Sequence, residues 1–172
     1  MFKTAQGRNT ASASKNNTVS NFNFLNRFEI QTRPIILDSN VYILDNQRNG
    51  RILTTIAGKL GKYHLKLILP RIIIYEVSKI TKNDPQNVTK KIFYLIKEIT
   101  SMDVTNEIKL ESKKLETKYY ECHNPDSIIL AMAGYLNAIL VTMDRKLHRT
   151  AELEGIESYT LKDFIKNWSI EV

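Results

Sequence analysis

Short apolar runs that end in polar residues recur along the chain and predict buried strands. Residues 34–37 are fully apolar and Asp38 follows them directly, while residues 138–142 repeat the pattern and end at Thr142. Continuous apolar runs of this length are typical of strands buried on both faces of a parallel sheet. Further strands are expected at residues 65–69, 103–105 and 156–160. The pattern therefore predicts a central, mainly parallel sheet.

Apolar residues at helical spacing predict helices between these strands. The expected helices are 41–48, 51–60, 71–82, 88–102, 107–122, 125–136, 145–154 and 161–168. Asn124 is a favourable N-cap, and Pro125 fits the first helical position of the sixth of these helices. Strands that alternate with helices indicate an α/β fold around a parallel sheet.

Residues 1–33 differ in composition from the rest of the chain. They are rich in Ser, Thr, Asn, Ala and Lys, and residues 11–20 carry almost no large apolar side chains. Such a segment buries too little surface to offset its ordering entropy, so we expect a largely disordered tail before a domain at 34–172. The tail holds five basic residues and one acidic residue, more than half of the net charge of +7. A basic arm that touches nucleic acid and a tail without function both fit this pattern.

Composition excludes several other classes of protein. The single cysteine, Cys122, rules out an internal disulfide framework and fits a reducing, cytoplasmic setting. No apolar run approaches the roughly 20 residues that a membrane span requires. His64, His123 and His148 do not form a metal-binding pattern, and neither a nucleophile elbow nor a glycine-rich phosphate loop is present.

Four acidic residues occupy comparable places near expected strand ends. Asp38 and Asp144 follow two strands, Glu76 lies in the helix after residues 65–69, and Asp126 begins a helix. Each alone fits a helix N-terminus or a solvated helix face. Together, clustered carboxylates would repel one another, and Mg²⁺ or Mn²⁺ removes that cost because such ions prefer oxygen ligands. These ions also support the hydrolysis of phosphodiesters.

Four short motifs around these acids resemble the PIN-domain ribonucleases, and the size of the body and its pair of helices between residues 88 and 122 look most like the VapC-type toxins. The motifs are residues 36–41, 75–77, 124–131 and 140–147, in the order that the family shows. The third carries Ser127 where the family often has alanine. The resemblance runs from about residue 34 to residue 164 and leaves the tail out.

The resemblance implies a three-layer α/β/α sandwich with an acidic Mg²⁺ or Mn²⁺ pocket that cleaves single-stranded RNA. By position, Asp38, Glu76, Asp126 and Asp144 would be the catalytic metal ligands. The residues that would orient these carboxylates by hydrogen bonds are Ser39, Asn40 and Thr142. The resemblance also implies a possible antitoxin partner and a homodimer.

Basic residues beside the acids are the expected contacts for RNA. Arg145, Lys146 and Arg149 follow the fourth acid, and Lys79 lies on the helix of Glu76. Such cations either hold RNA phosphates or form a solvated helix face. Tyr42, one turn beyond the first acid, fits either a stacking contact with a base or a core position.

Three alternatives remain open at this point. The chain fits an rRNA-processing or housekeeping nuclease of the same fold, or a catalytically silent RNA-binding module. The third is a phospho-acceptor domain with Asp38 as nucleophile. Haloacid-dehalogenase chemistry requires a second aspartate where this chain has Asn40, and a receiver domain requires an earlier acidic strand.

Overall fold

A sheet of five parallel strands runs through the part of the chain that the computed structural model describes, residues 33–166. Its strands lie in the order β3-β2-β1-β4-β5. They are β1 (Pro34–Leu37), β2 (Lys66–Pro70), β3 (Ile99–Met102), β4 (Ile139–Thr142) and β5 (Ser158–Thr160). Every pairing is parallel, as expected from the apolar runs.

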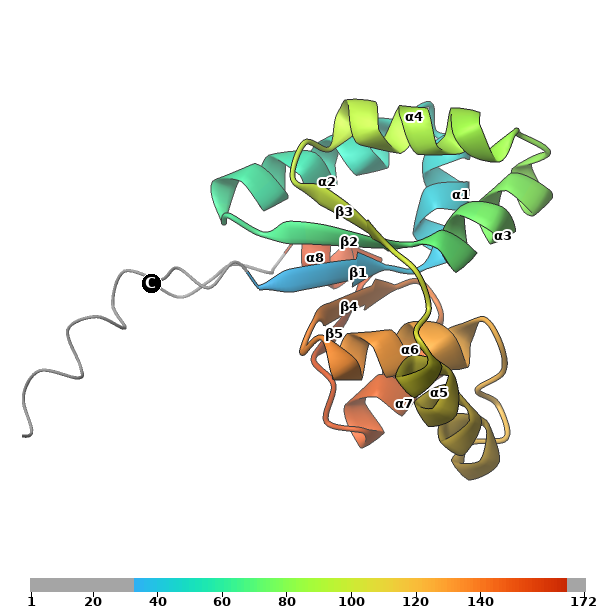
Figure 1. The fold of residues 1–172 in the computed structure, drawn as a ribbon. Coiled ribbons are helices and arrows are strands. Elements are labelled where there is room, and N and C mark those ends of the chain that lie inside the picture. Colours follow the sequence, from blue (N-terminus) through green and yellow to red (C-terminus); the bar gives the residue numbers. More distant parts are fainter. Residues whose placement is uncertain (1–32, 167–172) are drawn as a thin grey trace, which may run out of the picture. The chain divides into compact units, whose positions relative to one another are not determined.

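Helices cover both faces of this sheet (Figure 1). One face carries α1 (Ser39–Gln47), α2 (Arg51–Lys62), α3 (Arg71–Thr81) and α4 (Pro85–Leu95). The other carries α5 (Asn106–Lys118), α6 (Asp126–Tyr135) and α7 (Arg145–Leu153). The last helix, α8 (Leu161–Lys166), contacts β4 and β5. The predicted α/β/α sandwich around a parallel sheet is therefore confirmed.

The central strands are buried because helices lie against both of their faces. Ile35, Ile36 and Leu37 of β1 and Leu140 and Val141 of β4 are inaccessible to solvent. Each such side chain contributes roughly 1.5–3 kcal/mol when it leaves water. Burial on both faces explains why these strands read as continuous apolar runs rather than as alternating patterns.

The register of β1 and β4 places two predicted site residues next to each other. Leu37 pairs with Val141, and the backbone N–H of Asp38 donates to the carbonyl oxygen of Val141 at 2.9 Å. Asp38 and Thr142 therefore leave the sheet side by side, at the edge where parallel strands end.

Two boundaries around β3 differ from the sequence prediction. The expected helix 88–102 ends at Leu95, and the strand lies at Ile99–Met102 instead of 103–105. Ile96 leaves the helix with extended backbone, and its buried side chain continues the apolar spacing. Apolar residues spaced for a helix also suit a strand when the chain turns between them, so periodicity alone missed this change.

The start of α6 and the end of α5 are also corrected. The helix α6 begins at Asp126, and Pro125 occupies the position just before it, so the predictions of an Asn124 cap and of Pro125 at the first helical position are wrong. The helix α5 ends at Lys118 rather than near Cys122.

Parts of the sequence prediction lie outside the described residues. The expected tail does so except for Arg33, as do the last two residues of the helix predicted at 161–168. Within the described range, no helix combines the length and the apolarity that a membrane crossing requires.

Candidate active site

The sheet and its helices bring the four predicted acids to one region. Asp38 follows β1, and Asp144 follows β4 as the residue that caps α7. Glu76 lies in the middle of α3, and Asp126 is the first residue of α6. Because β1 and β4 are neighbours in the sheet, the first two acids share its carboxyl edge.

Asp38 is held in place by three side-chain hydrogen bonds. Its Oδ2 accepts from Thr142 Oγ1 at 3.0 Å and from Asn40 Nδ2 at 3.2 Å, and its Oδ1 accepts from Ser39 Oγ at 3.2 Å. The residue is only 1% exposed, and this burial raises the pKa of the carboxyl group despite the hydrogen bonds. A buried carboxylate with three donors is fixed in orientation, and its charge is costly unless a cation balances it.

Thr142 also connects Asp38 to Asp144. The backbone N–H of Asp144 donates to Thr142 Oγ1 at 2.9 Å, while the same hydroxyl donates to Asp38. Asp144 Oδ1 accepts from the backbone N–H groups of Lys146 at 2.7 Å and Leu147 at 3.3 Å, which caps α7. Asp144 thus caps α7 and also lies at the carboxyl edge of the sheet.

Glu76 reaches the same region from α3. Its Oε2 is buried and has no hydrogen-bond partner within residues 33–166. Partial burial raises the pKa of the Glu76 carboxyl group, a hydrogen bond with Ser39 lowers it, and the charge of Asp38 raises it further. An unpaired buried carboxylate oxygen costs free energy in the folded state, and a bound cation would offset that cost.

Asp126 lies within electrostatic reach of the other three acids. Burial and then the charges of Asp38, Asp144 and Glu76 raise the pKa of Asp126 to about 7. Repulsion of this kind requires the carboxyl groups to lie within mutual electrostatic reach. The four acids therefore form one electrostatic cluster at the carboxyl edge of the sheet, which we call the acid cluster.

The chemistry of the acid cluster fits a hard divalent cation. The side-chain oxygens that the cluster offers are all carboxylate oxygens, which Mg²⁺ and Mn²⁺ prefer. The unpaired Glu76 Oε2 and the repulsion at Asp126 are costs that a cation removes. As the side chains stand, no group of three or more His, Cys, Asp or Glu residues in the described range lies close enough together to hold an ion.

The predicted RNA contacts differ in how they lie. Arg145 lines a shallow hollow with Asn40 and Asp144, so it borders the acid cluster. Lys146 pairs with Glu121 on the surface at 3.0 Å. The other two, Lys79 and Arg149, are exposed on α3 and α7, and among the described residues neither forms an ion pair with a member of the acid cluster.

Two polar contacts behind Asp126 were not expected from the sequence. Ser127 is fully buried, and its hydroxyl donates to Glu116 Oε1 at 2.7 Å and lies 2.8 Å from Ser112 Oγ. The family often has alanine at Ser127, and here the serine joins α6 to α5. Ser112 and Glu116 are four residues apart on α5, so their spacing shows that they share a face of this helix. The spacing does not show which segment of the chain packs against that face.

Tyr42 is buried at 3% exposure, which confirms the core position as the right alternative. Its ring has no exposed face on which a base can stack.

Comparison with known proteins identifies the family. The sequence profile of the PIN domain matches residues 35–153, which is more than half of the chain. The chain therefore belongs to the PIN domain family, whose members are generally nucleases. A comparison with curated protein sequences gives no significant match.

Several solved structures share the fold. VapBC2 from Rickettsia felis, bound to a DNA fragment from its promoter, matches with a TM-score of 0.59 and 16% identity over 74% of this chain and 98% of that chain. DNA-bound VapBC from Salmonella typhimurium matches with a TM-score of 0.57 and 15% identity, over 75% of this chain and 98% of that chain. VapBC-1 from nontypeable Haemophilus influenzae matches with a TM-score of 0.57 and 18% identity, over 75% of this chain and 98% of that chain. At such low identity these matches establish the fold alone.

Proposed function

We propose that this chain is a Mg²⁺- or Mn²⁺-dependent endoribonuclease that hydrolyses phosphodiester bonds of single-stranded RNA. The observation that carries the proposal is the acid cluster, in which three carboxyl groups together with burial raise the pKa of Asp126 to about 7. A fold that gathers four acids at one sheet edge sacrifices stability there, and a bound cation offsets that loss.

The residues of the acid cluster divide into two pairs. Asp38 and Asp144 are fixed by Thr142 and by the start of α7, so they form the rigid part of the ligand set. Glu76 and Asp126 are the other two acids of the proposed ligand set, and their side chains would have to move closer to the first two for the set to hold an ion. A Mg²⁺ or Mn²⁺ ion bound there would activate the attacking water and offset the charge that develops on the phosphodiester.

Hydrogen bonds keep the rigid acids aimed at the ligand position. Ser39, Asn40 and Thr142 all donate to Asp38, so its oxygens cannot rotate away when the cluster is charged. Arg145 borders the cluster and is the basic residue best placed to hold an RNA phosphate there.

The partner that we propose is an antitoxin. Three solved structures that match with TM-scores above 0.5 are VapBC proteins, and this chain spans 98% of each matched chain. These matches support the proposal that the chain acts as the toxin of a toxin–antitoxin pair, and the resemblance to the VapC-type toxins implies that it forms a homodimer. Induced expression should then arrest growth, and Asp38→Asn should relieve the arrest. Growth that continues normally would favour the processing or housekeeping alternative.

Cleavage of a labelled single-stranded RNA tests the enzymatic proposal. The wild type should cut the RNA when Mn²⁺ is added, and Asp38→Asn and Asp126→Asn should lose this activity while they keep the fold. Glu111→Gln is the matched control, because Glu111 is an exposed acid outside the acid cluster and pairs with Lys114. Full activity of the double variant Asp38→Asn/Asp126→Asn, or of the wild type in excess EDTA, would contradict the proposal. RNA binding without metal and without cleavage would favour the silent module.

A further inference from the structure

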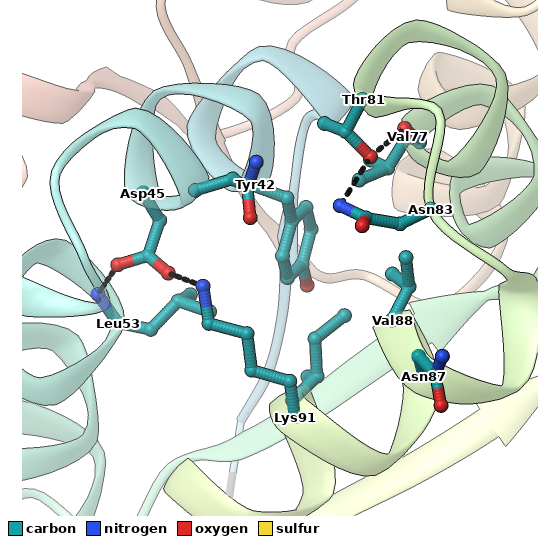
Figure 2. Close-up of a pocket in the computed structure, with 11 residues that line it drawn as sticks. Tyr42, Asp45, Leu53, Val77, Thr81, Asn83, Asn87, Val88 and Lys91 are labelled. Carbon is teal, nitrogen blue, oxygen red and sulfur yellow. Dashed lines mark hydrogen bonds and ion pairs between the residues drawn. The ribbon is translucent and has the colours of Figure 1, made fainter.

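A small pocket lies among α1, α2, α3 and α4, apart from the acid cluster (Figure 2). Its volume is about 160 Å³. The inner walls are apolar and the opening is polar, because exposed asparagines lie at the rim. The apolar walls are Leu53, Val77, Val88 and Ile92, and the rim residues are Asn46, Asn83 and Asn87.

The Tyr42 hydroxyl is the unexplained group in this pocket. Tyr42 stands in the middle of the pocket, with its hydroxyl directed toward α4 between Lys91 and Val88 (Figure 2). The hydroxyl oxygen is buried and has no hydrogen-bond partner within residues 33–166. A buried hydroxyl without a partner costs roughly 1–3 kcal/mol, and a ligand that bonds to it recovers that cost.

The walls of the pocket are fixed before any ligand arrives. The buried carboxylate of Asp45 accepts from the backbone N–H of Leu53 at 2.9 Å and pairs with Lys91 Nζ at 3.5 Å. These contacts tie α1 to α2 and α4 around the pocket. On the opposite side, Asn83 Nδ2 donates to Thr81 Oγ1 at 3.1 Å, so the amide of Asn83 is oriented as well. A pocket formed in advance loses little free energy when it binds a small ligand.

Size and lining together select the class of ligand. A cavity of about 150 Å³ holds a single benzene ring, so a pocket of about 160 Å³ matches one six-membered ring better than the fused double ring of a purine. Apolar walls suit the faces of a planar ring, while a tyrosine hydroxyl and asparagine amides suit the oxygen and nitrogen atoms on its edge. Because Asp45 already neutralises Lys91, the pocket has no spare positive charge for a phosphate.

We propose that this pocket binds one pyrimidine base of the RNA, with the Tyr42 hydroxyl as a hydrogen-bond partner of the base edge. This inference rests on the proposed ribonuclease function. It adds a determinant of substrate choice to that function: cleavage should favour sites with a pyrimidine in the pocket.

The position of the pocket suits a base near the cleaved bond. Tyr42 lies four residues after Asp38, which is about 6 Å along the axis of α1. On α3, Val77 follows Glu76 directly. Two helices that carry the acid cluster and its supporting groups thus also provide walls of the pocket. The rim residue Asn46 lies eight residues beyond Asp38, about 12 Å along α1, so the base that enters the pocket would belong to a nucleotide near the cleaved bond.

Nucleoside titration in excess EDTA tests the pocket independently of catalysis. Cytidine, uridine and adenosine are titrated into ¹⁵N-labelled protein, and the backbone amide signals of residues 83, 84 and 86–88 are followed by NMR. We expect cytidine and uridine to shift these signals saturably, and adenosine to bind at least about tenfold more weakly. Tyr42→Phe should weaken pyrimidine binding about tenfold, the value of one hydrogen bond of about 1.4 kcal/mol. Tyr94→Phe is the matched control, because it removes a hydroxyl from an 86% exposed tyrosine of α4.

Thermal unfolding shows that the variant is folded. Tyr42→Phe removes an unpaired buried hydroxyl and keeps the ring, so its melting temperature should equal or exceed that of the wild type. Equal pyrimidine affinity in wild type and Tyr42→Phe, equal affinity for adenosine, or shifts confined to other residues would overturn the pocket assignment. Pyrimidine binding without RNA cleavage in Mn²⁺ would refute only the ribonuclease function and leave the pocket assignment standing.

Discussion

Asp126 makes the stability of the metal-free protein depend on pH. The pKa of this carboxyl group is raised from an ordinary value of 3.8 to about 7 in the folded protein. Between these values the folded state binds more protons than the unfolded state, so the free energy of unfolding falls as pH rises. The contribution of Asp126 is fully present below about pH 3.8 and is lost as pH rises through about 7. Asp38 and Glu76, whose pKa values are also raised, act in the same direction.

The size of the effect follows from the shift. A difference of about 3 pKa units corresponds to about 4 kcal/mol, at about 1.4 kcal/mol per unit. Asp126 is partly exposed, so water and salt screen the repulsion, and we expect roughly half of that value or less. A change of about 1–2 kcal/mol is large compared with the total stability of a domain of this size.

Urea unfolding in EDTA at about pH 5 and about pH 8 measures the effect. Between pH 5 and pH 8 the free energy of unfolding of the wild type should fall by about 1–2 kcal/mol more than that of Asp126→Asn, because asparagine is neutral at both pH values. Mn²⁺ added at the higher pH should restore stability to the wild type by more than it does to the variant. An equal loss in both proteins, or a wild type that gains stability with pH relative to the variant, would refute the clustering of charge at Asp126.

Three further substitutions test the contacts around the site. Thr142→Val removes the hydroxyl that links two of the acids and should raise the Mn²⁺ concentration needed for cleavage by about 10–100-fold; an unchanged requirement would contradict its role. Ser127→Ala removes the link from α6 to α5 and should lower the free energy of unfolding in urea by about 1 kcal/mol; wild-type stability would show that the link is dispensable. Asp45→Ala should lower the free energy of unfolding by about 1–3 kcal/mol, because it leaves the buried backbone N–H of Leu53 unpaired. Asp45→Asn keeps an acceptor for this N–H and should lower the free energy of unfolding by less. Equal losses in the two variants would refute this cause.

Local chemistry made the sheet and the first acid predictable. A short apolar run followed by Asp38 indicates a strand buried on both faces, and the structure has it as β1. The second run of this type, at residues 138–142, predicts the strand that the structure has as β4, but its pairing with β1 comes from the structure and not from the sequence. Parallel topology then brings their ends together without any further information from the sequence.

Other features depend on contacts between distant segments, and local patterns do not reveal them. Ile96 continues the apolar spacing of α4 although the chain has already left the helix, so the predicted position of β3 was wrong. The contact of Glu116 with Ser127 joins two helices whose relative rotation no local pattern specifies. The buried, unpaired hydroxyl of Tyr42 is equally invisible in the sequence, because a core tyrosine normally finds a partner.

Calorimetric titration with Mn²⁺ tests the central claim most directly, namely that the acid cluster binds a divalent cation. The wild type should bind Mn²⁺ saturably near neutral pH, Asp38→Asn should bind it at least about tenfold more weakly, and the control Glu111→Gln should bind like the wild type. Equal Mn²⁺ affinity in the wild type and in Asp38→Asn would contradict the account.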